Sequence, residues 1–519
     1  MSAVGAARRI ARALPARASS PHAPRPHARS LTTAAASSLG EHRRQLADRM
    51  GTLLRTLDRA VPDGLLDRAR GVEAALADAD GAQVWLALAV LTGRLPLEEE
   101  VVETLRRLRL DGPGAALGPA VAAAVAPTRP VVRVEVVVGE VVVDVHHTSR
   151  TGLATGIQRV ARETARRWNR DHPVVLAGWT ADGTALTRLS PADAARAVGD
   201  PPGAASGSAG SDVLVPWAGS YALLELATEE PRTRRIAALA RWSGNGTGAV
   251  GFDCVPLTTA ETTADAMGAA FAQMLAGLRH VDRVATISEA AAVEYRGWRG
   301  MLVGTGWAGP SVDAVVLPVD AVEPPEQALA AARDRLLVAD LPMLLCVGSH
   351  EPRKNHLAVL HAAELLWRRG VLFSLLFVGG NAWHSERFTV RLGELKGAGR
   401  PVESVPALDD ASLWAAYRLA RAVLFPSLNE GFGLPVAEAL ASGTPVVTTR
   451  YGSTAEIAAG GGAVLVDPRN DADLAAAMAA VLEDDALHAR LSAEAAARPH
   501  RSWDAYASEL WRVLVEAGR

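Results

Sequence analysis

Two hydrophobic periods divide the chain. Between residues 41 and 126 apolar side chains recur at helical spacing, as at Leu53, Leu57 and Val61, which predicts amphipathic helices. After Pro130 short β-branched runs alternate with helix-period segments. This alternation is typical of a parallel, doubly wound sheet with helices on both faces. The pattern therefore predicts a helical module followed by α/β structure.

The strand and helix alternation occurs twice. The first set of predicted strands covers residues 141–145, 173–177, 213–216, 250–256, 284–287 and 315–318. The second set covers residues 344–347, 374–378, 422–425, 446–448 and 464–466, with helices between them at 357–367, 411–420, 435–441 and 474–482. Ligands of such open sheets bind at the carboxyl ends of the strands. The fold class predicted is α/β, with two Rossmann-like domains that face a cleft.

The predicted organisation has four parts. Residues 1–40 hold six arginines and no acid, a composition typical of a disordered leader, although a transit peptide also fits it. A helical module follows at 41–128, then an N-terminal Rossmann-like acceptor domain at 129–325 and a C-terminal Rossmann-like donor domain at 326–519. The chain between the two domains contains three consecutive residues, Glu-Pro-Pro, typical of a linker.

Overall composition narrows the class of protein. A net charge of -3 gives no bulk attraction to nucleic acid. Two cysteines exclude a disulfide framework and fit a reducing compartment. No apolar run reaches the roughly 18 residues of a spanning helix. We therefore expect a cytoplasmic enzyme, and leave peripheral membrane contact open.

The most informative stretch is residues 426–450, PSLNEGFGLPVAEALASGTPVVTTR. A strand leads through a glycine-rich turn into a helix whose first turn holds a proline. The free N–H groups of such a helix start bind anions, and Gly431 and Gly433 admit a phosphate closely. Glu430 precedes the helix and Glu438 lies on it, so one carboxylate can reach a sugar and the other a ribose. An ordinary strand, turn and helix with a solvated Glu438 remains the alternative.

These motifs resemble those of the family-4 retaining GT-B glycosyltransferases. Glu430 and Glu438 have that family's E-x7-E spacing, in the setting EGFGLPVAEALASGTPVV. The segment LLCVGSHEPRKN, residues 344–355, is similar to its donor-phosphate strand and loop, and YGSTAEI, residues 451–457, to a loop near the donor. Spaced motifs in matching contexts are stronger evidence than any single pattern.

Lys354 is the basic residue that this resemblance places on the donor diphosphate. Only two of the 54 basic residues are lysines, Lys354 and Lys396, and a lysine cannot be exchanged freely for arginine at a phosphate. A chance lysine in a solvated loop is the alternative. Many family members carry a second basic residue directly after the glycine equivalent to Gly348; this chain has Ser349 there, and Arg353 is the candidate replacement.

The first α/β domain carries weaker matches. TGLATGIQRV, residues 151–160, is similar to the family's glycine-containing first loop, in which Gly152 and Gly156 would admit donor or acceptor. FDCVP, residues 252–256, takes the place of an HDxxP strand end, so Asp253 is matched and Phe252 replaces the histidine that faces the donor sugar. This replacement suggests a donor without a hydroxyl at that point, such as a 6-deoxy sugar. The alternative is a shifted loop, in which another residue such as His146 or His147 reaches the sugar.

Two kinds of short string that are typical of dinucleotide or metal binding occur in the chain, but neither has the neighbouring structure that such a site requires. Residues 304–309 fit GxGxxG, but a proline and a strand follow where a cofactor loop needs a helix. Metal-dependent transferases use a D-x-D string to hold a divalent ion, but those at 78–80 and 471–473 lie in helix-like stretches. Acidic residues there usually lie on the surface or cap the start of a helix. The sequence thus predicts no metal and no cofactor.

The resemblance implies a retaining hexosyltransferase that uses a nucleotide-diphosphate sugar without a metal. Glu430, Lys354 and Arg353 would be catalytic, and the donor would contact the following residues: Gly152, Gly156, Asp253, Gly431, Phe432, Gly433, Leu434 and Glu438. The donor sugar is expected to be of mannosyl or rhamnosyl type, as in polysaccharide biosynthesis. The acceptor, whether glycan, lipid-linked or small molecule, is left open. The alternative is a catalytically weak paralogue that binds a nucleotide sugar or a glycan.

Overall fold

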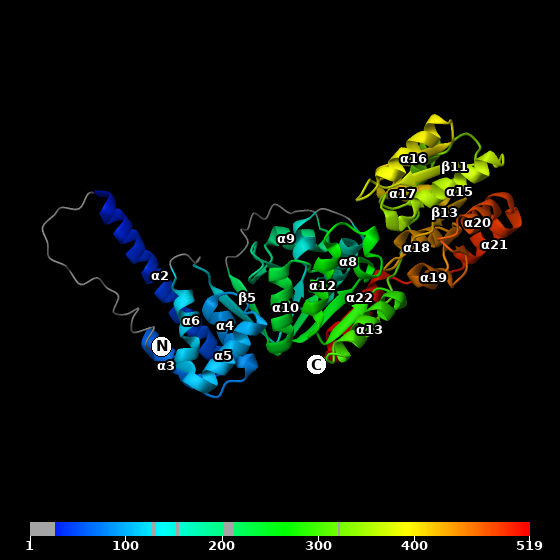
Figure 1. Ribbon diagram of the computed structural model, residues 1–519. Coiled ribbons are helices and arrows are strands. Elements are labelled where there is room, and N and C mark those ends of the chain that lie inside the picture. The colour runs from blue at the N-terminus through cyan, green and yellow to red at the C-terminus, as the bar shows by residue number, and fades with distance from the viewer. Residues whose placement is uncertain (1–25, 127–130, 152–154, 201–211, 320–321, 519) are drawn as a thin grey trace.

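The computed structural model describes residues 26–126, 131–151, 155–200, 212–319 and 322–518. Figure 1 shows three bodies in a row: a helical module, a first α/β domain and a second α/β domain. The two α/β domains confirm the predicted fold class. Each is built on its own sheet, and the loops at the carboxyl ends of the strands of one sheet face those of the other.

The helical module shares one hydrophobic core with the first domain. It consists of α2 (Pro26–Thr56), α3 (Leu65–Ala75), α4 (Gly81–Thr92), α5 (Glu98–Asp111) and α6 (Pro113–Ala124). All side chains from Val84 to Leu91 of α4 are buried, and the Trp85 ring is stacked on that of Trp217 at 6.5 Å between centroids. Burial of this much apolar surface joins the module firmly to the domain.

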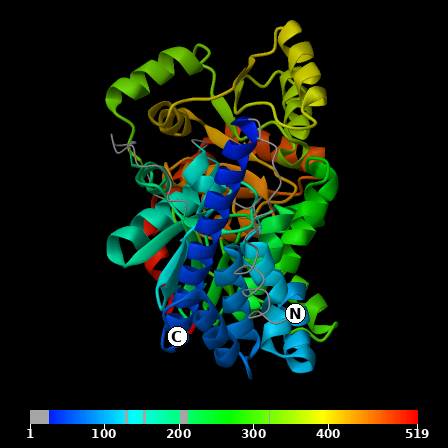
Figure 2. The ribbon, with the colours of Figure 1, turned by 90° about the vertical axis from the view of Figure 1, so that its left-hand side faces the viewer.

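The start of α2 corrects the predicted leader of residues 1–40. The helix already begins at Pro26, and Figure 2 shows it as a long helix across the front of the module. The Ala- and Ser-rich stretch that follows Pro26 lacks a helix breaker until Gly40, so it continues the helix toward the buried part. Residues 1–25 lie outside the described part of the chain.

A nine-stranded sheet forms the first domain, in the order β1-β5-β4-β3-β2-β6-β7-β8-β9. Its strands are β1 (Val134–Val138), β2 (Val141–Asp144), β3 (Val174–Trp179), β4 (Leu186–Arg188), β5 (Val213–Trp217), β6 (Ser220–Leu223), β7 (Gly246–Gly251), β8 (Arg283–Thr286) and β9 (Ser311–Ala314). Only β4 runs antiparallel to its neighbours among the described strands. The helices are α7 (His146–Arg150), α8 (Gly156–Asp171), α9 (Pro191–Val198), α10 (Glu230–Trp242), α11 (Val255–Thr258), α12 (Met267–Leu278) and α13 (Glu289–Val303).

Two predicted strands of this domain were misplaced. The strand predicted at 250–256 ends at Gly251, and Pro256 lies instead in the first turn of α11, because proline has no N–H for a strand ladder. The strand predicted at 315–318 follows β9. Val315 and Leu317 are buried in the apolar cluster that includes Ile287 and Phe432, which explains the apolar run outside a strand.

A six-stranded, fully parallel sheet forms the second domain, in the order β12-β11-β10-β13-β14-β15. The strands are β10 (Met343–Val347), β11 (Ser374–Val378), β12 (Val402–Val405), β13 (Ala422–Phe425), β14 (Val446–Thr449) and β15 (Ala463–Val466). The helices are α14 (Glu326–Leu336), α15 (His356–Arg368), α16 (Glu386–Gly397), α17 (Asp410–Leu419), α18 (Leu434–Ala441), α19 (Gly452–Ala458), α20 (Asp471–Glu483) and α21 (Asp485–Ala496). The central strands are buried on both faces, which explains their unbroken apolar runs.

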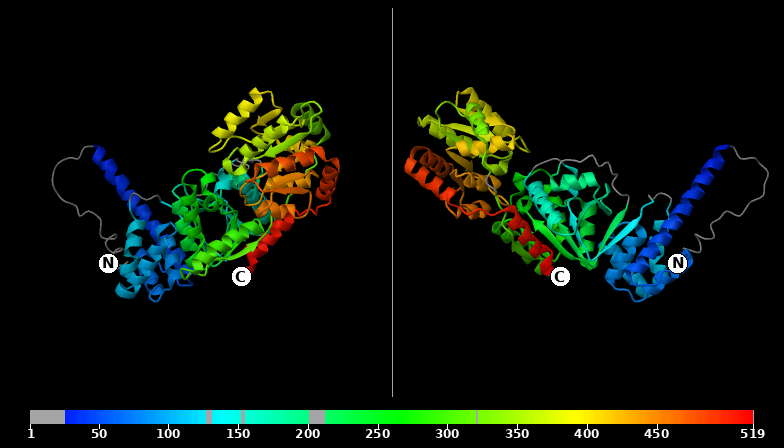
Figure 3. Two further views of the ribbon diagram at one scale, coloured as in Figure 1. Left: turned by 45° about the vertical axis from the view of Figure 1, so that its right-hand side comes forward. Right: turned by 180° about the vertical axis from the view of Figure 1, so that it is seen from behind.

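The last helix, α22 (Trp503–Leu514), returns to the first domain, so the prediction that 326–519 form one domain is wrong at its end. Figure 3 shows α22, in red, beside the first domain in both views. The indole N–H of Trp168 donates to the Ala507 carbonyl at 2.9 Å, and the Trp511 ring lies edge-on to Trp168 and flat on His172. This return could not be predicted from the sequence, because an amphipathic helix fits either domain equally well.

Hydrogen bonds join the facing loops of the two domains. Ser288 Oγ donates to the Gly431 carbonyl at 2.6 Å, and the Glu456 carboxylate accepts from two N–H groups at the start of α13. The Trp383 indole donates to the Thr262 carbonyl at 2.9 Å. The cleft is therefore closed by contacts on both of its sides.

Trp511→Ala should destabilise the first domain, although Trp511 follows the second domain in sequence. Removal of a buried tryptophan costs about 3–5 kcal/mol, so thermal unfolding followed by fluorescence should show a clear fall in the midpoint of the first domain. Arg512→Ala, on the exposed side of the same helix, serves as the control and should unfold as the wild type does. Equal midpoints for all three proteins would mean that α22 contributes nothing to the fold.

Candidate active site

The glycine-rich turn between β13 and α18 forms the floor of the site. Gly433 stands before α18 with φ 104°, and no side chain caps the helix start. Pro435 carries no N–H and the Val436 N–H donates to the Gly433 carbonyl, so the Leu434 N–H is the one at the helix start that is left for an anion. A Cβ on Gly431 would lie 2.7 Å from an Asp253 carboxylate oxygen of the first domain. Only glycine allows this close approach of the two domains.

Glu430 is the centre of a buried ion cluster. Its Oε1 lies 2.6 Å from Lys354 Nζ and its Oε2 lies 2.6 Å from Arg353 Nη1. Burial alone would raise the pKa of the Glu430 carboxyl, but the charges of Arg353 and Lys354 lower it to about 2. Burial also lowers the pKa of the Lys354 ammonium, against the attraction of Glu430. The structure thus brings together the three residues predicted to be catalytic.

The turn after β10 holds these two cations in place. Gly348 follows the strand with φ 140°, and a Cβ there would lie 3.5 Å from Lys354 Cε, so the lysine stem packs over the glycine. The Lys354 ammonium lies 4.7 Å from the centroid of Phe425 at the end of β13. Arg353 also donates to the Asn429 carbonyl at 2.8 Å. The turn is therefore fastened to the neighbouring strand end by both basic side chains.

Asp253 faces this cluster from the first domain. Its Oδ1 accepts from the Val255 N–H at 3.1 Å, and its Oδ2 is the oxygen that approaches Gly431. Burial, supported by the nearby Glu294, raises the pKa of the Asp253 carboxyl to about 6, and Arg353 acts in the opposite direction. The predicted site residue of the first domain thus lies against the glycine-rich turn.

The Phe252 ring does not face the cleft. It is 3% exposed and packs in one apolar cluster with Phe432 and Val250. The hypothesis that this ring contacts a methyl group of the donor sugar therefore has no support in the geometry. The Phe432 side chain is buried in the same cluster, so only its backbone is available to a substrate.

Glu438 is bound across the domain boundary. Its Oε1 accepts from Arg159 Nη1 of α8 at 2.8 Å and its Oε2 from the Tyr417 hydroxyl at 2.9 Å. Burial raises the pKa of the Glu438 carboxyl, and Arg159 opposes that change. The alternative interpretation, in which Glu438 is solvated, is thus excluded. Arg159 was not singled out from the sequence, although it lies within the TGIQRV string.

The start of α8 meets the start of α18. A Cβ on Gly156 would lie 3.3 Å from Leu434 Cδ1. Two helix N-termini, one from each domain, are therefore adjacent, and both favour negative charge. Gly152, the other glycine of the first loop, lies outside the described residues.

A buried network of three charged side chains holds helix α7, which precedes the glycine-containing loop of the first domain. The sequence did not indicate this network. Arg232 on α10 lies 2.9 Å from Asp144 Oδ1 and 3.1 Å from Glu225 Oε1. The Glu225 carboxylate in turn accepts from the N–H groups of His147 and Thr148. These three charges are on separate elements, so no local spacing could have revealed the network. It fixes α7, which leads into the glycine-containing loop.

The GxGxxG string and the two D-x-D strings have structural roles in the fold. The GxGxxG string at 304–309 is followed by β9, and Asp80 caps α4 by accepting from the Gln83 N–H at 2.9 Å. Asp473 accepts from the Asp467 N–H. Across the described ranges no group of three or more His, Cys, Asp and Glu side chains could hold a metal. None of the described helices is both long and apolar enough to cross a membrane.

Comparison with known proteins places the second domain in a family. Residues 331–498 match the family model described as Glycosyl transferases group 1. The serotype-specific mannosyltransferase WbdA of Escherichia coli is 30% identical over 207 residues, 38% of this chain and 25% of that protein. O-antigen chain mannosyltransferase B of Escherichia coli is 36% identical over 129 residues, 24% of this chain and 33% of that protein. The chain thus spans a third or less of these relatives.

The solved structure of Anabaena HepE in complex with UDP and glucose resembles both α/β domains. It superposes with a TM-score of 0.52 at 13% identity, over 72% of this chain and 99% of that chain. At this identity the likeness concerns the fold alone. The predicted GT-B arrangement of two Rossmann-like domains is thereby confirmed.

Asp253→Asn should change the pH dependence of stability. The pKa of Asp253 in the folded protein, about 6, exceeds its ordinary value of 3.8, so the folded state binds this proton more tightly than the unfolded state does. Its favourable contribution is full below about pH 4 and is lost as pH rises through 6. The Asp253→Asn variant has no carboxyl to deprotonate here, so its free energy of unfolding should not fall in this way. Relative to wild type, it should therefore become more stable as pH rises from 4 to 7.

The control for this experiment is Asp313→Asn, which changes an exposed carboxylate on β9. Its melting temperature should follow that of the wild type over the same pH range. A constant difference in melting temperature between Asp253→Asn and the wild type would contradict the raised pKa.

Proposed function

Because residues 331–498 form a domain of the glycosyl transferases group 1 family, we propose that this protein transfers a hexosyl group from a nucleotide-diphosphate sugar to an acceptor hydroxyl, with retention. The ion cluster of Glu430, Lys354 and Arg353 beside the free N-terminus of α18 is the observation that carries the proposal. It supplies positive charge and N–H donors at one point of the cleft, as a leaving diphosphate requires.

Each predicted residue receives a role in this proposal. The donor diphosphate would lie between Lys354, Arg353 and the backbone N–H groups of residues 431–434. Glu430 fixes both cations through one bond each, and the Lys354 ammonium keeps two further N–H donors for phosphate oxygens. Leaving-group charge would thus be met by preorganised protein groups. We expect no metal ion to be required.

Retention follows from attack on the face that the diphosphate leaves. The acceptor oxygen would bond to the anomeric carbon as the bond from that carbon to the phosphate oxygen breaks. The electron pair goes to the diphosphate, which accepts the acceptor's proton. Contacts between the domains exclude water, which limits hydrolysis of the donor.

Glu438 would bind the ribose of the donor. Its carboxylate uses two of about four acceptor positions, for Arg159 and Tyr417. The remaining positions can accept from ribose hydroxyls. Arg159 belongs to the first domain, so the Glu438 carboxylate would both bind the ribose and hold the two domains together.

A mannosyl donor is favoured, since both named relatives are mannosyltransferases. A rhamnosyl donor was the sequence-based alternative and remains one. The acceptor would be a growing glycan, as in polysaccharide biosynthesis. A panel of nucleotide sugars tested for donor hydrolysis would identify the donor and would also separate an enzyme from a protein that only binds nucleotide sugar.

Glu430→Gln and Lys354→Ala should each lower the transfer rate at least about a hundredfold, because each removes a charge-assisted contact that strengthens in the transition state. Donor turnover and circular dichroism would be measured together. Lys396→Ala is a matched control, since Lys396 is the only other lysine and pairs with Glu403 at the surface. Near-normal turnover in either folded site variant would remove that residue from the catalytic centre.

Activity should persist in excess EDTA, because Arg353, Lys354 and the α18 N-terminus are placed to stabilise the leaving group. The rate of donor turnover would be compared before and after chelation and after addition of Mg²⁺ or Mn²⁺. Loss of activity on chelation with recovery on metal addition would contradict this account of the leaving group.

A further inference from the structure

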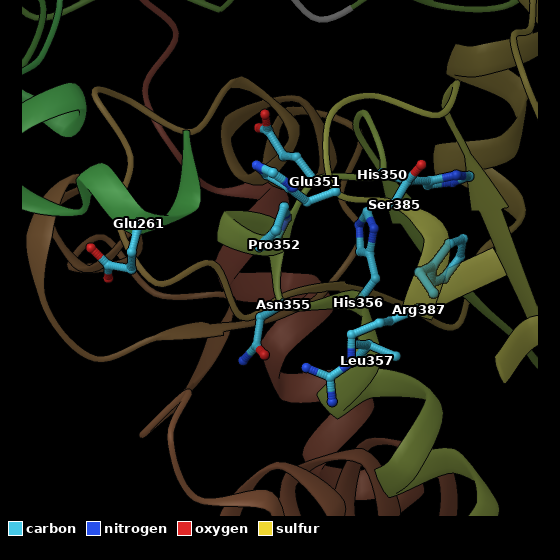
Figure 4. A pocket seen from close by; sticks show the side chains of 11 residues that line it. Glu261, His350, Glu351, Pro352, Asn355, His356, Leu357, Ser385 and Arg387 are labelled. Atoms are coloured by element: carbon cyan, nitrogen blue, oxygen red, sulfur yellow. The ribbon is translucent and has the colours of Figure 1, made fainter. Parts of the chain in front are cut away.

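A second polar pocket lies beside the ion cluster, on the other side of the turn that carries Lys354. We name it the histidine pocket after His350 and His356, which line it, and its volume is about 300 Å³. Figure 4 shows its side chains. The lining residues used below are Glu261, His350, Glu351, His356, Arg387 and Phe388.

The histidine pocket is separate from the proposed donor site. Arg353 and Lys354 both pair with Glu430, whereas the pocket is formed by the starts of α15 and α16. A side-chain hydrogen bond from Arg353 Nη2 to Glu351 Oε1, at 2.6 Å, links the two. The same short turn therefore has one face toward the donor diphosphate and the other toward the pocket. A ligand in the pocket would lie next to the donor without overlapping its phosphates.

Both domains contribute to the pocket. Glu261 is the contribution of the first domain, and the neighbouring Thr262 accepts the hydrogen bond from the Trp383 indole of the second domain. The pocket is thus complete only when the domains are in contact, as the site of a second substrate in a transferase has to be.

Hydrogen-bond donors are available at two helix starts. Neither α15 nor α16 has a side-chain cap. The first N–H groups of α15, at His356 and Leu357, and of α16, at Glu386 and Arg387, have no partner within the described chain. The Arg387 guanidinium lies at the rim of the pocket, and it adds a cationic donor.

Two ring nitrogens at the floor of the pocket lack partners. His350 is 4% exposed and His356 is 6% exposed, and His350 Nε2 and His356 Nδ1 make no hydrogen bond. His350 Nδ1 lies 2.9 Å from Asn381 Oδ1, which assigns the proton to Nδ1 and leaves Nε2 an acceptor. Burial lowers the pKa of both imidazoles, that of His356 to about 3, so both rings are neutral.

The mixture of groups identifies the chemistry of the ligand. The carboxylate of Glu261 and the neutral His350 accept hydrogen bonds, while N–H groups and Arg387 donate them. Glu351 Oε1 already accepts from Arg353 Nη2 at 2.6 Å. The charges of Glu261 and Arg387 oppose each other across the pocket, so no net charge selects an ion, whereas sugar hydroxyls donate and accept at once. Phe388 adds an apolar surface for the C–H face of a sugar ring.

We propose that the histidine pocket is a carbohydrate subsite, which holds one sugar residue of the acceptor glycan beside the donor. The assignment to the acceptor rests on the proposed function; the assignment as a sugar site rests on the pocket itself. The glycan would enter past Arg387 and Glu261, and it would present a hydroxyl toward the donor across the turn of residues 351–355.

The test uses the full chain and methyl hexosides as probes. Saturation-transfer NMR would measure the binding of methyl α-mannoside, glucoside, galactoside and rhamnoside to wild type, Arg387→Ala and Glu261→Gln. Both substitutions lie on exposed side chains, so folding should be preserved. Arg391→Ala, one turn further along α16 and paired with Glu394, is the matched control. Hydrolysis of the nucleotide sugar, without acceptor, would be measured on the same samples.

We expect at least one methyl hexoside to bind wild type and Arg391→Ala equally, and to bind the two pocket variants about tenfold more weakly, since each loses a hydrogen bond to a charged group. Donor hydrolysis should stay within about twofold in all four proteins. Absence of binding to wild type, or equal binding to all four, would overturn the carbohydrate subsite. A parallel fall in donor hydrolysis would overturn the acceptor assignment. Binding of hexosides by a wild type that hydrolyses no nucleotide sugar would overturn the proposed function alone.

Discussion

The buried pairing of one carboxylate with two cations is the interaction on which the site depends. Glu430 pairs with Lys354 and Arg353 at once, and Glu351 is a second partner of Arg353. Without Glu430 the buried Lys354 ammonium would lose its carboxylate partner, at a cost of several kcal/mol. The cluster also links the turn after β10 to the turn after β13. Strands β10 and β13 are neighbours in the sheet although they lie far apart in sequence. Positive charge for an anionic ligand is therefore held in place before the ligand arrives.

Closure of the cleft depends on a second set of polar contacts. Arg159 reaches Glu438, and Ser288 reaches the Gly431 carbonyl, so two side chains of the first domain bind the glycine-rich turn and helix α18 of the second. The absence of a Cβ at Gly431 and Gly156 allows the two backbones to approach. A Cβ at Gly431 would lie 2.8 Å from the Phe252 carbonyl oxygen, so a larger residue there would force the two backbones apart, whereas at Gly156 the Leu434 side chain could shift instead.

The sequence predicted five of the six strands and four of the eight helices that the structure describes in the second domain. These five strands are continuous apolar runs, and the functional residues lie within short motifs, so both are visible locally. Glu430, Lys354 and Arg353 were found in this way. Strand β12, with the sequence VESV at the edge of the sheet, has no such run and was missed. Residues such as Arg232 and Tyr417 were missed because their partners are on other elements, and pairing of that kind depends on the tertiary fold. Helix α22 was assigned to the wrong domain for the same reason.

The position of α22 also affects the order in which the protein can fold during synthesis. This helix follows the whole second domain in sequence, yet Trp168 and Val160 of the first domain belong to the apolar cluster that it completes. A nascent chain must therefore carry an uncovered apolar face on α8 while more than three hundred further residues are synthesised, since residue 171 ends α8 and residue 503 begins α22. During that interval the first domain is open to association with other chains, and its final closure is a step that joins distant parts of the protein.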